Sequence, residues 1–405
     1  MTDFFQLPYG RQYIDEIDIE AVVEVLKSDF LTCGPAVSSF EAGLAKIVQA
    51  PHVTACANGT AALHMASMAL DLAPGDWVIV PAVTFLATAN AVRFVGADVW
   101  FADVDPETGL LTQDGLERAY QAGIAAGKEI KAVYSVHLNG QVADPVEIYN
   151  FAQQNNIYVV EDASHAIGST FEMEGGLIQV GSCQTCDMTT FSFHPVKTIT
   201  MGEGGAVTCK SDALFRKLQL LRNHGMTRSP GEFKINAQAF SEKGEPNPWY
   251  YEMHQIGFNY RASDISCALG LSQLNKLETF KSRRSKLATL YDEELKDLAP
   301  LLRPVAKVFG CHPVLHLYPV LIDFSKLKFD RASLMKALGA QGILTQVHYL
   351  PVNRQPYYTN LYGQFELPGA NAYYENVLSL PFFPAMTDEQ ISIVVRKLKK
   401  CLLAG

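Results

Sequence analysis

The chain contains the run Phe191-Ser192-Phe193-His194-Pro195-Val196-Lys197, which is followed by Gly202-Glu203-Gly204-Gly205. The two phenylalanines predict a buried strand, and the glycines predict a tight return of the chain. Lys197 therefore lies between a strand and a glycine-rich return, whereas most lysines are solvated. Burial at this place would lower the pKa of the Lys197 ammonium, and the free amine could then form an imine.

An aspartate lies 35 residues before this lysine. Asp162 ends the run Tyr158–Glu161, and ligands of open α/β sheets gather at the carboxyl ends of strands. A lysine and an aspartate in these places indicate pyridoxal phosphate. The lysine would hold the cofactor aldehyde as a Schiff base, and the aspartate would keep the pyridine nitrogen protonated. The plainer alternative for Asp162 is a cap for a helix that begins at Ala163.

Other residues could complete such a site, although each also has a plainer interpretation. Gly59 and Thr60 follow a predicted strand and open a predicted helix, so their backbone N–H groups could bind a phosphate. Turns of this kind are common. Ser192 could add a donor, and Phe85 could either stack on the pyridine ring or belong to the core. His165 could bond the 3-oxygen of the cofactor or be a packed histidine.

The composition is that of a globular enzyme. The 405 residues are 48% hydrophobic and 19% charged, enough for a large core and a second, smaller domain. A net charge of −9 without a basic cluster argues against nucleic acid as a partner. No apolar run approaches the ~20 residues that span a bilayer, and Met1–Phe5 lacks the pattern of a secretory signal. We expect a soluble cytoplasmic protein that binds neither nucleic acid nor a membrane.

The eight cysteines are scattered through apolar segments, as expected for buried thiols in a reducing compartment. Cys183 and Cys186 form the one C-x-x-C motif. No second Cys/His pair follows at the spacing of zinc ligands, so no metal site is predicted. Redox exchange at this motif is conceivable, but the spacing favours two packing thiols at the start of a strand.

Short apolar runs alternate with helical patterns in the first half of the chain and predict an α/β domain with a mainly parallel sheet of seven strands. One of the intervening helices is predicted at Val146–Gln154. The predicted strands are His52–Cys56, Trp77–Pro81, Val99–Val104, Ile130–His137, Ile157–Asp162, Thr189–Phe193 and Ala206–Cys209. Near the start, apolar residues at helical spacing predict an amphipathic helix capped by Asp15. These apolar residues are Ile19, Val22, Val23 and Leu26.

A long helical pattern begins near Arg261 and leads into a second unit. Strands are predicted there at Leu315–Phe324 and Ile343–His348, and helices at Ala332–Leu338 and Asp388–Leu402. We therefore expect a large cofactor-binding domain over residues 1–284, including the N-terminal segment, and a small C-terminal α+β domain over residues 285–405. The polar stretch Thr227–Asn247 is predicted to be a surface loop that could order against a partner subunit.

The sequence resembles the DegT/StrS-type sugar-nucleotide aminotransferases nearly end to end. This resemblance implies the aspartate-aminotransferase fold, the type I fold of pyridoxal-phosphate enzymes. The most specific part is the block from Ser192 to Gly205. The other matching segments are Leu31–Pro35, Phe40-Glu41, Asn58–Leu63, Glu161–Ala166, Arg222–Gly225 and Gly257–Arg261.

The resemblance also implies roles for individual residues. It makes Lys197 the catalytic Schiff-base lysine, Asp162 the partner of the pyridinium nitrogen, and His165, often glutamine in the family, a contact of the 3-oxygen. The further cofactor contacts that it implies are Asn58, Gly59, Thr60, Phe85 and Ser192. Asn259 falls at the position that reaches the phosphate of the neighbouring subunit's cofactor, which implies a homodimer with two shared sites.

Several stretches are most similar to family members that aminate C4 of a UDP-linked 2-acetamido-2,6-dideoxy-4-keto-hexose of β-L-arabino configuration. In that reaction L-glutamate is the donor, 2-oxoglutarate is released, and the aminated sugar enters pseudaminic acid synthesis. By this similarity the sugar nucleotide would contact Tyr9, Asp29, Phe30, Leu31, Thr32, Asn58, Gln346, Val347, His348 and Tyr349. The chain departs from its relatives at Met201, where threonine is common, and in its longer Thr227–Asn247 loop.

The sequence leaves other functions open. The acceptor could be another nucleotide 4-keto sugar, such as the UDP-linked D-xylo sugar of the bacillosamine route or a dTDP sugar. Dehydrating members of the family replace the lysine, often by histidine, so the presence of Lys197 favours amino transfer. A non-catalytic regulator that binds pyridoxal phosphate is a weaker alternative because Lys197, Asp162 and Ser192 are all present. A simple amino-acid transaminase would need an arginine for the second carboxylate, and no candidate is evident.

Overall fold

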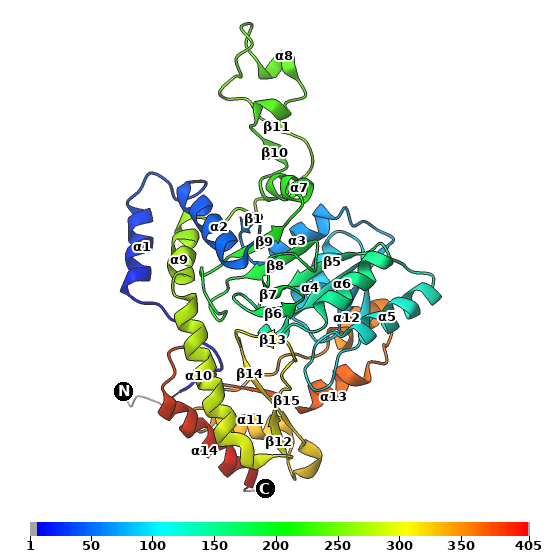
Figure 1. The fold of residues 1–405 in the computed structure, drawn as a ribbon, viewed down its shortest axis with the longest axis vertical. Coiled ribbons are helices and arrows are strands. Elements are labelled where there is room, and N and C mark those ends of the chain that lie inside the picture. Colours follow the sequence, from blue (N-terminus) through cyan, green and yellow to red (C-terminus); the bar gives the residue numbers. More distant parts are fainter. Residues whose placement is uncertain (1–5, 404–405) are drawn as a thin grey trace.

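A computed structural model describes residues 6–403, and its central feature is a seven-stranded sheet (Figure 1). In spatial order the strands are β1 (His52–Cys56), β9 (Gly205–Cys209), β8 (Met188–Ser192), β5 (Tyr158–Asp162), β4 (Glu129–Val136), β2 (Asp76–Pro81) and β3 (Asp98–Ala102). β9 runs antiparallel to β1 and β8, whereas the other neighbouring pairs are parallel. The predicted α/β class, the mainly parallel sheet and all seven predicted strands are confirmed.

Helices cover both faces of this sheet. One face packs against α3 (Gly59–Ala69), α4 (Leu86–Phe94) and α7 (Asp212–Arg222), and the other against α2 (Pro35–Val48), α5 (Gln113–Ala125), α6 (Pro145–Gln154) and α9 (Asp264–Leu274). Side chains alternate between the faces: Val78 and Val80 of β2 join the first core cluster, and Ile79 joins another. This double covering explains why the strands are continuously apolar.

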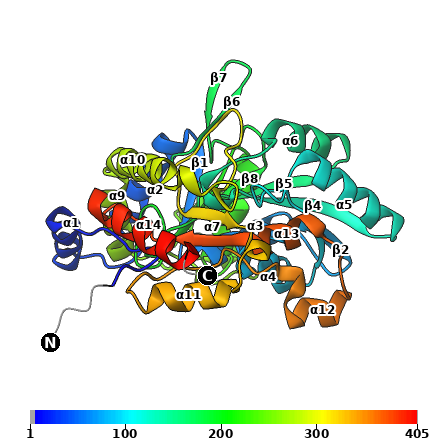
Figure 2. The ribbon, with the colours of Figure 1, turned by 90° about the horizontal axis from the view of Figure 1, so that it is seen from below.

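The N-terminal helix α1 (Glu16–Leu26) lies outside α9 (Figures 1 and 2). Asp15 caps it as predicted, accepting hydrogen bonds from the first-turn N–H groups. The predicted apolar stripe, however, is not buried: Ile19 and Leu26 are exposed. The buried residue is Asp18, whose carboxylate accepts a 2.6 Å hydrogen bond from the Ser272 hydroxyl on α9. A polar contact therefore holds α1 to the body of this chain.

Helix α10 (Leu277–Leu295) leads from the large sheet to a second core cluster. That cluster lies around a three-stranded sheet of β12 (Leu302–Pro304), β14 (Tyr318–Ile322) and β15 (Val377–Leu380), with α11 (Arg331–Gly339) and α14 (Asp388–Leu403). Strand β14 and both helices were predicted. The expected boundary between residues 284 and 285 falls inside α10, and Leu7 belongs to the second cluster.

The predicted strand Ile343–His348 is wrong. Ile343 bridges to Leu7 and Gln346 bridges to Ser379, so the segment changes partner within three residues and forms no continuous ladder. The body of the chain also contains β6 (Thr170–Met173), β7 (Gly176–Gln179), β13 (Cys311–His312), α12 (Pro356–Tyr362) and α13 (Pro368–Asn376). The β6–β7 hairpin projects from the body (Figure 2).

Residues 226–253 form an arm that projects far from the sheet (Figure 1). At its base β10 (Met226–Thr227) pairs with β11 (Glu252–Met253), and α8 (Asn236–Ala239) lies near its tip. Buried Glu252 accepts hydrogen bonds from the N–H groups of Lys234 and Ile235. Trp249 is 71% exposed, so the arm presents an aromatic side chain to solvent.

Among residues 6–403, no helix is long and apolar enough to cross a membrane. Within the same described range, no group of three or more His, Cys, Asp or Glu side chains could hold a metal ion. Cys183 and Cys186 are both buried. The Cys183 thiol lies 3.3 Å from the Thr208 hydroxyl and the Cys186 thiol 3.2 Å from the Thr189 hydroxyl, so both are packed into the sheet.

Candidate active site

A cavity of about 610 Å³ opens at the carboxyl ends of β4, β5 and β8. It brings together most of the predicted site residues from both halves of the chain, as expected at this edge of an open α/β sheet. The predicted residues that line it are Tyr9, Asn58, Gly59, Thr60, Phe85, Asp162, His165, Ser192, Lys197, Gln346, Val347, His348 and Tyr349.

Lys197 lies in the loop between β8 and β9. The loop closes on itself because Phe193 N–H donates to Gly204 O and Met201 N–H donates to Phe193 O, each over 2.9 Å. Burial lowers the pKa of Lys197 to about 8, although the nearby Asp162 carboxylate acts in the opposite direction. About a tenth of the lysine is therefore the free amine at pH 7, far more than for a lysine with the ordinary pKa, and the direction is the one that the sequence predicted.

Three hydrogen bonds fix the carboxylate of Asp162. Its Oδ2 accepts a 2.7 Å bond from the Thr88 hydroxyl, and its Oδ1 accepts bonds from the N–H and the hydroxyl of Ser164 over 3.1 and 2.6 Å. Thr88 in turn lies 2.8 Å from the Thr84 hydroxyl. No helix begins at Ala163, so the alternative of a helix cap is wrong. The sequence did not indicate Thr88, although it comes three residues after Phe85.

The N-terminus of α3 forms an anion seat beside β8. Asn58 caps the helix by accepting the N–H of Ala61 over 2.9 Å. The N–H groups of Gly59 and Thr60 lie in the first turn, where a helix offers them no carbonyl partner. A Cβ at position 59 would lie 2.7 Å from Cβ of Ser192. Glycine therefore lets the helix end approach Ser192 closely enough for both to hold one phosphate.

Neutral histidines form the wall facing Lys197. His165 Nδ1 accepts the N–H of Asn139 over 3.3 Å, so its proton is on Nε2, which lies 3.3 Å from the Tyr349 hydroxyl. Burial, and then the charge of Lys197, lowers the pKa of His165 well below its ordinary value. The same causes lower the pKa of His348 to about 3. His165 therefore offers one N–H donor to the cavity without a charge.

A buried contact between Glu161 and His137 behind Asp162 was not predicted. Glu161 points to the opposite face of β5, where its carboxylate accepts a 2.9 Å hydrogen bond from Thr189 and lies 3.4 Å from His137 Nε2. Burial raises the pKa of Glu161, but His137 and the threonine hydroxyl outweigh it and hold the pKa below its ordinary value. The pair ties the ends of β4, β5 and β8 together beneath the cavity. Its members are far apart in sequence, so no local pattern reveals it.

Five predicted residues lie outside this cavity: Asp29, Phe30, Leu31, Thr32 and Asn259. All five are exposed. They form a second group, because Leu31 O accepts the N–H of Asp264 over 3.0 Å, and Asn259 bridges to Asn223 at the end of α7. A single chain does not bring the two groups together, and the roles of these five residues stay predictions.

The cavity fits pyridoxal phosphate at each functional group. The α3 seat with Ser192 suits the phosphate, the fixed Asp162 carboxylate suits a protonated ring nitrogen, and Lys197 suits the aldehyde. Phe85 lines the same cavity and is 57% exposed, leaving its ring free to stack. Fold and site together define a pyridoxal-phosphate-dependent enzyme of the type I fold. Bound there, the cofactor supplies an electron sink and carries the amino group.

The chain belongs to the DegT/DnrJ/EryC1/StrS aminotransferase family, whose sequence profile matches residues 12–399. It is 34% identical over 388 residues to the UDP-4-amino-4,6-dideoxy-N-acetyl-beta-L-altrosamine transaminase of Campylobacter jejuni, covering 96% of this chain and 95% of the relative. It is also 34% identical over 396 residues to the spore coat polysaccharide biosynthesis protein SpsC of Bacillus subtilis, covering 97% and 96%.

Solved structures agree with this assignment. Helicobacter pylori PseC, an aminotransferase involved in the biosynthesis of pseudoaminic acid, superimposes with a TM-score of 0.86 at 28% identity, covering 99% of this chain and 100% of PseC. The pyridoxal-phosphate form of the sugar aminotransferase Spr1654 from Streptococcus pneumoniae gives 0.85 at 28% identity, covering 99% of each chain. The protein is a pyridoxal-phosphate-dependent sugar aminotransferase that acts on nucleotide sugars.

Proposed function

We propose that the protein transfers the amino group of L-glutamate to C4 of a UDP-linked 2-acetamido-2,6-dideoxy-4-keto-hexose of β-L-arabino configuration. The products are 2-oxoglutarate and a UDP-linked 4-amino-4,6-dideoxy sugar for pseudaminic acid synthesis. The similarity to the C. jejuni transaminase and to H. pylori PseC supports this acceptor. We propose the cytoplasm as its location, since none of the eight cysteines is paired.

The observation that carries the proposal is the side-chain content of the cavity. Lys197 and Asp162 meet there with neutral polar side chains such as Gln346 and Tyr349, and no arginine of the described chain lines the cavity. A pocket with hydroxyl, amide and imidazole groups suits a sugar with hydroxyl and acetamido substituents.

Lys197 moves the protons of the reaction. Its lowered pKa makes the free amine more available than in an ordinary lysine, and this amine can take the proton from the α-carbon of glutamate. Water then releases the carbon skeleton as 2-oxoglutarate, and the amino group stays behind for the second half-reaction. In the second half-reaction the same ammonium returns a proton to C4 of the sugar. Because Lys197 approaches from one side of the cavity only, the new amine forms with a single configuration at C4. Neutral His165 would donate its Nε2–H to the cofactor's 3-oxygen.

We further propose that two copies of the chain form a homodimer with shared sites. Asn259 would reach the phosphate of the partner's cofactor, and residues 29–32 would contact the partner's sugar nucleotide. The exposure of these residues on one chain supports this arrangement. Size-exclusion chromatography with light scattering tests the dimer, and a monomer that retains full activity would contradict it.

The acceptor is tested by separating the two half-reactions. The purified enzyme is converted to its pyridoxamine form with glutamate, and excess donor is removed. The UDP-linked 4-keto-6-deoxy sugars of L-arabino and D-xylo configuration are then offered separately while the absorbance of the pyridoxal form is followed. We expect fast recovery with the L-arabino sugar alone. Recovery with the D-xylo sugar alone would assign the enzyme to the bacillosamine route, and no recovery with either would direct the search to other nucleotides.

A further inference from the structure

The direction of the His165 N–H depends on the residues around the ring. A neutral imidazole carries its proton on one of two nitrogens, and the hydrogen bond made by one nitrogen decides the role of the other. Nε2 of His165 lies 3.3 Å from the Tyr349 hydroxyl at the cavity wall, whereas Nδ1 lies against buried Asn139. Only a proton on Nε2 gives the cavity a donor, so the residue behind the ring selects the form that the site needs.

Asn139, the residue behind the ring, is 5% exposed. Its backbone N–H lies 3.3 Å from Nδ1 of His165. Because a backbone N–H can only donate, Nδ1 is the acceptor and the proton is on Nε2. The direction of this N–H is set by the backbone of Asn139, which has a φ of +60°. This left-handed conformation is uncommon for residues other than glycine, and asparagine is one of the few that tolerate it.

The segment before β14 holds Asn139 in this conformation. Oδ1 of Asn139 accepts the N–H of Leu317 over 2.6 Å, and its carbonyl accepts the N–H of His316 over 3.4 Å. The next residue, Gly140, has a φ of +84°, and a Cβ there would lie 2.3 Å from the carbonyl oxygen of Val314. The turn that contains Asn139 is therefore packed directly against the segment that leads into the small sheet.

The same segment covers one face of the His165 ring. The centroids of the His165 and His316 rings are 4.3 Å apart, and the planes are inclined by 40°. Buried Arg284 of α10 donates to the carbonyl oxygens of His316 and Leu315 over 3.0 and 3.3 Å. A guanidinium that binds two successive carbonyls fixes the course of the segment. The His165 ring is thus held at one edge by Asn139 and on one face by His316.

We propose that Asn139 is a positioning residue of the active site. Its left-handed backbone directs the N–H that keeps the proton of His165 on Nε2, and its side chain ties this arrangement to the segment before β14. The proposal rests on the proposed function, which gives His165 the cofactor's 3-oxygen as its acceptor. Asn139 does not line the cavity, so its effect passes through His165. It should therefore change the rate of the reaction and leave the affinity for substrates unchanged.

The first test reads the position of the proton without any reaction. The cofactor-free protein is isotopically labelled at the histidine ring nitrogens for NMR, and His165 is identified by the signals that His165→Gln lacks. Wild type should carry the proton on Nε2 alone. Asn139→Val should show a mixture of both forms, because a β-branched residue avoids positive φ and the N–H turns away. Asn139→Gly, which adopts this φ freely, should keep the wild-type form.

Two results of this test would overturn the proposal. They are a proton on Nδ1 in wild type and an unchanged proton position in a folded Asn139→Val protein. Thermal unfolding shows whether the valine variant is folded. Asn139→Ala, which has a smaller penalty at this φ, replaces it if it is not, and the same two results then decide.

The second test measures the glutamate half-reaction of the holoenzyme. Asn139→Val should lower its maximal rate by about 5- to 20-fold, because part of the molecules lose a hydrogen bond to a charged oxygen. The glutamate concentration at half-maximal rate should stay within about twofold of wild type. Asn139→Gly should keep the maximal rate within about threefold, since its N–H still reaches His165.

Asn156→Val is the matched control for this test. Asn156 is an exposed asparagine between α6 and β5 with a φ of +54°, and it lies outside the cavity. The control should lower the thermal stability and leave the rate unchanged. Losses of rate that are equal in Asn139→Val and Asn139→Gly, or equal in Asn139→Val and Asn156→Val, would overturn the proposal.

A double variant tests whether Asn139 acts through His165. His165→Leu removes the donor, so adding Asn139→Val to it should lower the rate by less than about twofold further. A further loss as large as in the wild-type background would show that Asn139 acts on another part of the site and would overturn the proposal. If wild type does not react with glutamate, the proposed function fails, and the position of the His165 proton in the cofactor-free protein still decides the role of Asn139.

Discussion

Replacing Lys197 by methionine should stabilise the cofactor-free protein while abolishing amino transfer. Burial lowers the pKa of this lysine from an ordinary 10.5 to about 8, and a difference of this size corresponds to about 3 kcal/mol. Lys197 lines an open cavity and is only partly buried, so water screens its ammonium. We therefore expect about half of this value, roughly 1.5 kcal/mol, as the gain in the free energy of unfolding at pH 7.

The pH dependence of this gain has a definite sign. The folded-state pKa lies below the unfolded-state pKa, so the unfolded chain binds more protons at this site between pH 8 and 10.5. The wild-type apoprotein should therefore become more stable as the pH rises through this range. The advantage of Lys197→Met should shrink over the same range.

Urea denaturation of the cofactor-free proteins, followed by tryptophan fluorescence at pH 7 and pH 10, measures the effect. Lys210→Met, at an exposed lysine after β9, is the control and should change little at either pH. The reasoning would be refuted if Lys197→Met were no more stable than wild type at pH 7, or if its gain were the same at both pH values.

Three further changes test other parts of the site. Gly59→Ala should weaken cofactor binding by about 10- to 100-fold in an absorbance titration, because the new Cβ would lie 2.7 Å from Cβ of Ser192; unchanged affinity would show that the α3 seat does not hold the phosphate. His165→Gln should keep the turnover rate within about threefold, whereas His165→Leu, which lacks the N–H donor, should lose about 10- to 100-fold; equal rates would contradict the donor role. Glu41→Ala should lower the free energy of unfolding by about 2–4 kcal/mol, since it leaves partly buried Arg222 without its carboxylate; thermal unfolding would show this, and a loss below about 0.5 kcal/mol would contradict it.

Much of the fold could be predicted because its strands carry strong local signals. The seven strands of the large sheet are short, apolar and covered on both faces, so each stands out from the helices around it. The small sheet was harder to predict. β15 has only four residues, and Ile343–His348 has the apolar character of a strand but alternates between two bridging partners. Such pairing depends on which segments meet in the folded chain, and the sequence of one segment does not contain this information.

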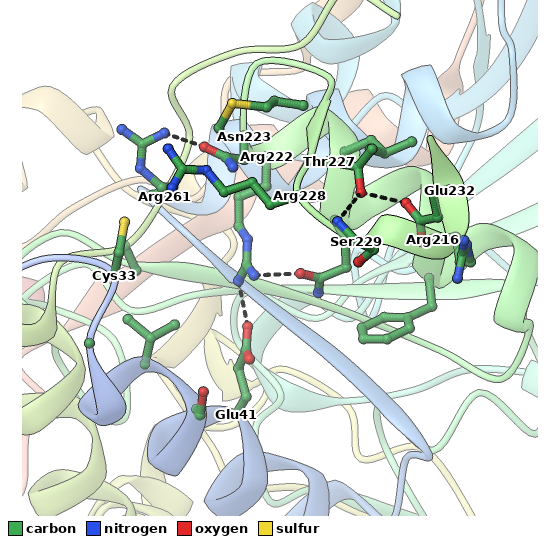
Figure 3. A pocket seen from close by; sticks show the side chains of 18 residues that line it. Cys33, Glu41, Arg216, Arg222, Asn223, Thr227, Arg228, Ser229, Glu232 and Arg261 are labelled. Atoms are coloured by element: carbon green, nitrogen blue, oxygen red, sulfur yellow. Dashed lines mark hydrogen bonds and ion pairs between the residues drawn. The ribbon is translucent and has the colours of Figure 1, made fainter. Parts of the chain in front are cut away.

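The site residues also divide into those with a local sequence signal and those whose role depends on the folded chain. Lys197, Asp162 and the α3 seat lie in motifs whose spacing reflects their chemistry, and the structure brings them into one cavity. Thr88 was missed because its role depends on how α4 lies over the end of β5. A second cavity, lined by Arg228 and Arg261 (Figure 3), was missed because Arg228 lies at the base of the arm and Arg261 comes after its end. In α1 the apolar periodicity correctly predicted a helix, but Ile19 of its apolar stripe is exposed on the single chain.

The closed loop that carries Lys197 limits how the length of the chain can vary. Phe193 and Gly204 are joined by a backbone hydrogen bond, which comes directly after the last β8–β9 pair, Ser192 with Gly205. An insertion or deletion between them would change where the lysine points. The arm at residues 226–253 has no such constraint at its tip, where α8 has four residues. We therefore expect proteins built on this plan to differ in length at the arm and to keep the number of residues between Phe193 and Gly204 fixed.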